Sequence, residues 1–106
     1  MITIDDFRKV ELRTAEVIAC EAHPNADRLY VIKLRVGTEE RQIVSGIRQH
    51  YTPEQLVGRT IILAANLEPA DLRGVQSHGM LLAVRDGDKV VVLTTQMPAA
   101  SGLVVS

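Results

Sequence analysis

Apolar and polar residues alternate along most of the chain, and this is the period of a half-buried strand. The clearest example runs from Arg28 to Val36. Its apolar residues occupy every second position: Tyr30, Ile32, Leu34 and Val36. The pattern predicts a strand with one face in a core and with Lys33 and Arg35 on the other face. Further strands are predicted at Ala15–Ala19, Arg41–Ser45, Thr60–Ala65, Met80–Val84 and Val90–Leu93.

Two segments depart from this alternation and predict helical structure. Near the N-terminus Ile4, Phe7 and Val10 recur at helical spacing, with Thr3 before them as a cap residue. We expect this short helix to pack as a lid on one end of a barrel. Tyr51–Leu56 carries a proline at the first helical position and predicts a single helical turn.

The order of these elements predicts the fold class. A short helix, three strands, a helical turn and two or three more strands describe an all-β, five-stranded OB-fold barrel. The helical turn lies between strands 3 and 4, and Leu103–Val105 belongs to a C-terminal extension. A small SH3-like barrel is the main alternative, and the turn at Pro53 argues against it. With 106 residues the chain suits one domain, residues 1–106.

One connection is unusually long for a compact domain. The 13 residues from Asn66 to His78 join two predicted strands and are expected to form a loop. The loop carries Gln76, Ser77 and His78, whose neutral polar groups suit contacts to ribose, base edges and phosphate. The alternative is a closed loop whose side chains bond to its own backbone. The residue types leave both interpretations open.

Charge and composition limit the classes of function. The 12 Lys and Arg residues are balanced by 13 Asp and Glu residues, so a nucleic-acid site requires local clustering of the cations. No nucleophile, base and carboxylate share a meaningful spacing, so we expect no enzyme. The single cysteine and three histidines offer no metal cluster, and no cofactor is predicted. A cytoplasmic protein is expected, since no signal or membrane segment is visible.

Two further features concern the binding mode. Aromatic residues are scarce, with only Phe7, Tyr30 and Tyr51, so stacking on single-stranded bases is disfavoured. A folded RNA read through its shape and backbone fits better. Leu29, Val31 and the tail supply more apolar surface than a small barrel can bury, which suggests a homodimer.

Six motifs in order along the chain carry a resemblance to a known family. They are Asp6–Arg13, His23–Tyr30, Ile43–Ile47, Tyr51–Gly58, Asn66–Pro69 and Arg73–Ala83. Their combination resembles the tRNA-binding domain found as a free-standing protein and appended to methionyl- and phenylalanyl-tRNA synthetases. A related branch resembles the CsaA chaperones.

The resemblance implies an OB fold, a homodimer and tRNA binding without catalysis. Alternative partners are unfolded peptides, as for an export chaperone, or an aminoacyl-tRNA synthetase on which the chain docks. The resemblance implies that Asn66, Ser77 and Met80 lie on the binding surface. Candidate backbone contacts by the same resemblance are Arg28, Lys33 and Arg73. The predicted site is completed by Arg13, Arg35 and His78.

Overall fold

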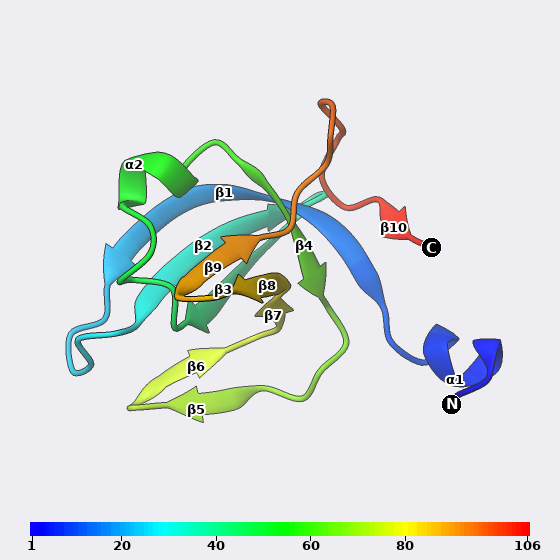
Figure 1. Ribbon diagram of the computed structural model, residues 1–106, viewed down its shortest axis with the longest axis horizontal. Coiled ribbons are helices and arrows are strands. Elements are labelled where there is room, and N and C mark those ends of the chain that lie inside the picture. The colour runs from blue at the N-terminus through cyan, green and yellow to red at the C-terminus, as the bar shows by residue number, and fades with distance from the viewer.

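The computed structural model describes all residues from 1 to 106, which form two short helices and ten strands (Figure 1). Their order is α1 (Ile4–Arg8), β1 (Leu12–Ala22), β2 (Tyr30–Val36), β3 (Glu39–Ser45), α2 (Pro53–Leu56), β4 (Thr60–Ala64), β5 (Ala70–Leu72), β6 (Val75–Ser77), β7 (Met80–Leu81), β8 (Ala83–Asp86), β9 (Lys89–Val92) and β10 (Val104–Val105). The main sheet runs β3-β2-β1-β4-β7, with β10 beside β1. The predicted OB fold, with α2 between the third and fourth strands, is confirmed.

Strand β1 is the centre of this sheet. Its 11 residues pair antiparallel with β4 through Leu12–Glu16 and with β2 through Glu16–Ala22. A register shift between Val17 and Ala19 interrupts the second ladder. An extra residue in one strand of a pair bends that strand and increases its twist. The bend allows β1 to pair with both β4 and β2 in a curled sheet. It also interrupts the predicted alternation of buried and exposed residues, so Ala19 is only half-buried.

The predicted inward face of β2 fills the core. Tyr30, Ile32, Leu34 and Val36 are all at most 7% exposed. The Tyr30 hydroxyl donates to the carbonyl of Tyr51 at 2.6 Å, and the Tyr51 hydroxyl accepts from the Val92 amide at 3.0 Å. Burial raises the pKa of Tyr30, so the phenol keeps the proton that it donates. Two of the three aromatic residues therefore fasten α2 and β9 to the barrel.

The expected loop from Asn66 to His78 is in fact largely a β-hairpin, and that prediction was wrong. β5 and β6 pair through a two-residue turn at Arg73 and Gly74, with φ of 56° and 92°. These angles are those of a type I′ turn, which favours Asn-Gly or Asp-Gly. Because the first position here is arginine, the sequence lacks the Asn-Gly or Asp-Gly pair that indicates such a turn. The predicted strand Met80–Val84 is likewise divided, because β8 leaves the main sheet to pair with β9.

The N-terminal helix forms as predicted, but it does not act as a lid. Thr3 Oγ1 accepts from the Asp6 amide at 3.1 Å, yet no residue of α1 is buried. Phe7 is 40% exposed and Ile4 is 61% exposed. The Asn66 side chain accepts from the Glu11 amide and donates to the Lys9 carbonyl, which fixes the chain just after α1. The helix therefore lies outside the barrel, at the right of Figure 1.

The tail returns to β1 and is anchored by Thr14 and Gly102. Thr14 Oγ1 donates to the Ala100 carbonyl at 2.7 Å and accepts from the Leu103 amide at 3.0 Å. Gly102 has φ of 82°, and a Cβ there would lie 2.6 Å from the Gly37 nitrogen. Only glycine fits so close to Gly37, because the atoms that a Cβ would meet belong to the backbone and cannot rotate away as a side chain could.

We expect Gly102→Ala to destabilise the fold by about 3 kcal/mol, because left-handed backbone strain and steric overlap act together. Gly58→Ala is the matched control: its φ is 87°, but no atom lies within 4 Å of the new Cβ. The control should lower the free energy of unfolding by only about 1 kcal/mol. Thermal denaturation checks both, and equal destabilisation would contradict the close approach at Gly102.

Candidate nucleic-acid interface

The β1–β2 turn lies near the tip of the β5–β6 hairpin, at the left of Figure 1. Three arginines contact or line this turn. Arg73 donates to the Asn25 carbonyl at 3.3 Å, and Arg48 donates to the Ala26 carbonyl at 3.2 Å. Arg28 and Arg73 line one shallow depression of about 390 Å³ over this turn. We call Arg28, Arg48 and Arg73 the arginine cluster. The prediction from sequence included two of its members and missed Arg48.

The members of the cluster are among the seven basic side chains that have no carboxylate partner. Five of the 12 basic side chains have a carboxylate oxygen within 4.0 Å: Arg8, Lys9, Arg13, Arg35 and Arg41. No member of the cluster does. Backbone carbonyls orient Arg48 and Arg73 without cancelling their charge, so this end of the barrel can attract a polyanion. Asp27 also lines the depression and reduces its net charge.

The outer face of the sheet is less basic than the sequence suggested. Arg35 pairs with Glu16 at 2.9 Å, so its charge is compensated. Lys33 donates to the side-chain oxygen of Gln42 at 2.5 Å and keeps its charge. Glu40 stands opposite Arg35 on β3. Of the two predicted cations on this face, Lys33 is the one free to meet phosphate.

Three of the predicted contact residues are engaged within the fold. Arg13 pairs with Glu11 and donates to the Gly102 carbonyl at 2.8 Å, which ties down the tail. Ser77 is 4% exposed, and its hydroxyl accepts from the Val44 amide and donates to the Gly79 carbonyl, each at 2.9 Å.

Asn66 is the third engaged residue, bound to the chain after α1 as described above. His78 and Met80 are exposed, with Met80 at 52%. As RNA contacts, all of these positions stay predictions.

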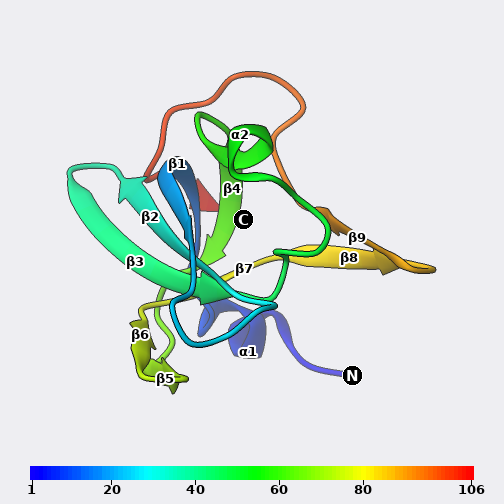
Figure 2. The same cartoon turned by 90° about the vertical axis from the view of Figure 1, so that its left-hand side faces the viewer.

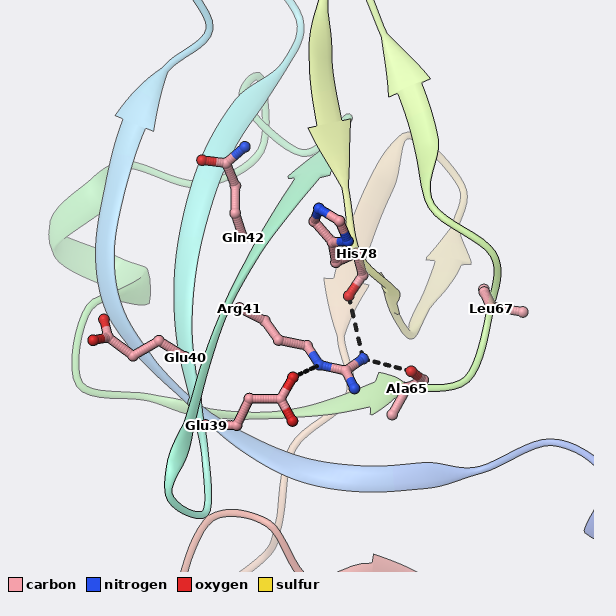
Figure 3. A pocket seen from close by; sticks show the side chains of 7 residues that line it. All are labelled: Glu39, Glu40, Arg41, Gln42, Ala65, Leu67 and His78. Atoms are coloured by element: carbon pink, nitrogen blue, oxygen red, sulfur yellow. Dashed lines mark hydrogen bonds and ion pairs between the residues drawn. The ribbon is translucent and has the colours of Figure 1, made fainter.

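Arg41 is a further residue that sequence reasoning missed. It pairs with Glu39 and donates to the carbonyls of Ala65 and His78, as Figure 3 shows. These carbonyls begin and end the segment that contains the β5–β6 hairpin. A signal was available, because Arg41 stands opposite Leu34 and thus on the inner face of the sheet. An arginine at an inward position indicates a structural contact.

The residues that could carry covalent or metal chemistry are not arranged for it. Burial, followed by the charges of Glu21 and Glu54, raises the pKa of the Cys20 thiol to about 11. At neutral pH the thiol is protonated and therefore a poor nucleophile. No three His, Cys, Asp or Glu side chains come together as a metal site. Neither helix is long and apolar enough to cross a bilayer.

Comparison with known proteins agrees with this picture. Residues 12–103 match the family model described as "Putative tRNA binding domain". The chain belongs to the tRNA-binding domain family. It is 50% identical over 105 residues to the methionine–tRNA ligase of Thermotoga maritima, covering 99% of the chain and 17% of the ligase. Against the ligase of Thermococcus kodakarensis it is 50% identical over 92 residues, with 87% and 12% covered. This tRNA-binding domain thus spans less than a fifth of these relatives.

Solved structures share the fold over the whole chain. A MetRS-related protein from Pyrococcus horikoshii superposes with a TM-score of 0.93 at 31% identity, covering 100% of this chain and 98% of that one. The chaperone CsaA of Bacillus anthracis gives 0.89 at 27% identity, with 100% and 99% covered. The tRNA-binding domain therefore resembles proteins of nearly its own length as well as segments of much longer ones.

We expect Arg73→Asn to raise the free energy of unfolding by about 0.5–1 kcal/mol. Asparagine adopts the left-handed conformation of a type I′ turn more readily than arginine does. The exposed hydrogen bond to Asn25 contributes little in comparison. Arg73→Lys, which keeps the strain, is the control and should leave stability unchanged. A lower melting temperature for Arg73→Asn would show that the arginine itself stabilises the turn.

Proposed function

We propose that this tRNA-binding domain, residues 1–106, binds structured RNA, most simply tRNA, without catalysing a reaction. The observation that carries the proposal is the arginine cluster. Carbonyls orient Arg48 and Arg73, and none of the three members is ion-paired with a carboxylate. Lys33, His78 and Met80 are the further contact residues that we propose. A cytoplasmic location fits this role.

The fold supports recognition of RNA shape and backbone. Tyr30 and Tyr51 are bonded within the barrel, so they cannot stack on bases as single-strand binders require. Glu68 and Asp71 place negative charge near the hairpin. With a net charge of -1, affinity should be modest and sensitive to salt.

Neutralising the cluster should weaken tRNA binding. For Arg28→Gln/Arg48→Gln/Arg73→Gln we expect at least a tenfold lower affinity for total tRNA at low salt. The slope of log affinity against log salt should fall by roughly one for each phosphate that the variant no longer neutralises. Fluorescence anisotropy with labelled tRNA measures both quantities.

The matched control removes the same charge elsewhere. Arg59→Gln/Arg85→Gln/Lys89→Gln also eliminates three cations without carboxylate partners, and it should change affinity by less than about threefold. Equal weakening in the two variants would mean that only overall charge matters. Failure of the unaltered protein to bind at tens of micromolar would contradict the proposal.

We further propose that the domain acts as a homodimer. A five-residue helix is not stable in water by itself, and nothing in the chain covers the apolar side of α1. Val104 in β10 is 64% exposed, and the free edge of that strand is open. The β8–β9 hairpin projects from the barrel in Figure 2, with Val84 and Val91 each more than 40% exposed. A second copy placed by twofold symmetry would bury such surfaces in pairs.

Phe7→Ser should shift the protein from dimer toward monomer in sedimentation velocity, because it removes the aromatic ring from the exposed side of α1. Val57→Ser changes a similarly exposed apolar residue, 45% against 40%, and should leave the mass unchanged. A monomeric unaltered protein at 100 micromolar would refute the dimer.

The CsaA similarity keeps a peptide-binding role as a second candidate. That role requires an apolar groove near Met80 and Leu81. Leu81 is buried, and the nearby depression beside Arg41 is lined mainly by polar residues. The ligase relatives favour a third role, docking on a synthetase. Suppression of aggregation without tRNA binding would support the chaperone role, and co-purification with methionyl-tRNA synthetase would support docking.

A further inference from the structure

The side chain of Gln42 joins two parts of the molecule that meet along the edge of β3. Its Nε2 donates to the Gln76 carbonyl in β6 at 3.0 Å, and its Oε1 accepts from Lys33 Nζ in β2 at 2.5 Å. A carbonyl can only accept and an ammonium can only donate, so these partners fix which end of the amide faces each of them. The Gln42 carbonyl also accepts from the His78 amide at 2.8 Å. One residue therefore links Lys33 to the hairpin.

Lys33 has a second candidate partner on the same face of the sheet. It stands opposite Gln42, and Glu40 lies two residues before Gln42 on β3. Diagonal neighbours on one face of an antiparallel pair are about 7–8 Å apart, within reach of a long side chain. All three residues line one open depression of about 510 Å³. Yet no carboxylate oxygen lies within 4.0 Å of the ammonium, which is bonded to the neutral amide of Gln42.

We propose that Gln42 is a positioning residue for RNA binding, which holds the Lys33 ammonium on a neutral acceptor beside the hairpin instead of on Glu40. The inference rests on the proposed function, because it concerns the preparation of one proposed phosphate contact. An amide oxygen occupies one of the three N–H donors of an ammonium and leaves its charge uncompensated. The other donors are free to meet phosphate. A carboxylate would compensate the charge, as Glu16 does for Arg35.

The first test asks whether Gln42 acts through Lys33. Gln42→Met removes both hydrogen bonds but keeps a long, neutral side chain. Lys33 then loses its order and can turn to Glu40, so affinity for total tRNA at low salt should fall about threefold. Lys33→Gln should lower affinity about fivefold alone but less than about twofold beside Gln42→Met, because both variants withdraw the same ammonium. If the two factors multiply, Gln42 acts independently of Lys33 and the proposal is overturned.

Glu40→Gln tests which carboxylate takes up the displaced ammonium. In the Gln42→Met background it should raise affinity at least about twofold more than it does in the unaltered protein, because it removes the partner that compensates Lys33. An equal gain in both proteins would overturn the role of Gln42 in keeping Lys33 from Glu40.

Gln42→Glu tests the need for a neutral acceptor. A carboxylate there would pair with Lys33 and could not donate to the Gln76 carbonyl. Affinity should fall about tenfold, and the slope of log affinity against log salt should decrease by about one. Gln55→Glu is the matched control, because the side chain at this position accepts from the Thr52 amide and a carboxylate can do the same. It should change affinity by less than about twofold, and equal weakening by both variants would contradict the proposal.

The mobility of the ammonium groups separates this proposal from the binding function. Lys89 is exposed and has no carboxylate partner, so it serves as an internal reference. Nitrogen NMR relaxation in the RNA-free protein should show Lys33 more restricted than Lys89, and Gln42→Met should abolish the difference. Equal mobility of the two lysines in the unaltered protein would overturn the proposal. Absence of tRNA binding would instead overturn the proposed function, while relaxation would still report on the bond between Lys33 and Gln42.

Discussion

Strand β1 hydrogen-bonds to β4 along its first half and to β2 along its second half, and the register shift between Val17 and Ala19 bends it within the β2 ladder. The same strand receives the tail through Thr14 and β10. Both edges of β1 are therefore occupied, and the sheet must curl around it. That curl brings the chain after β4 back across β3. There Arg41 of β3 donates to the His78 carbonyl, and the Val44 amide of β3 donates to the Ser77 hydroxyl. The location of the β5–β6 hairpin, and so of Arg73, depends on this closure.

Closure also explains how a nearly neutral chain can present positive charge. Residues 28, 48 and 73 are distant in sequence and meet only because the β1–β2 turn and the hairpin end on the same side of the barrel. The arginines that are bonded within the barrel differ in whether a carboxylate lies beside them. Arg13, Arg35 and Arg41 meet carboxylates, and their charge is used within the fold. Arg48 and Arg73 meet carbonyls, which order a guanidinium while leaving its charge available to a ligand.

The parts that sequence predicted well are those that depend on local pattern. The buried face from Tyr30 to Val36 follows from strand periodicity, and the helical turn at Pro53 follows from local backbone chemistry. The parts that it missed depend on contacts between distant residues. Nothing local shows that Asn66 fixes the chain just after α1, or that Arg48 reaches Ala26. The sequence did not predict the Arg73–Gly74 turn, because its first position is arginine. A type I′ turn favours asparagine, aspartate or glycine there.

Ser77 illustrates how a predicted contact residue can be engaged within the fold instead. A direct contact from Ser77 to RNA would break its bond to the Val44 amide, and an unsatisfied buried amide costs about 1–3 kcal/mol. A single exposed hydrogen bond to RNA contributes less free energy than this cost, since water competes for the same groups. The balance therefore favours Ser77 as the residue that holds β6 against β3. Ser77 thereby fixes the position of His78, the next residue in the chain, whose amide donates to the Gln42 carbonyl at 2.8 Å while its side chain is exposed.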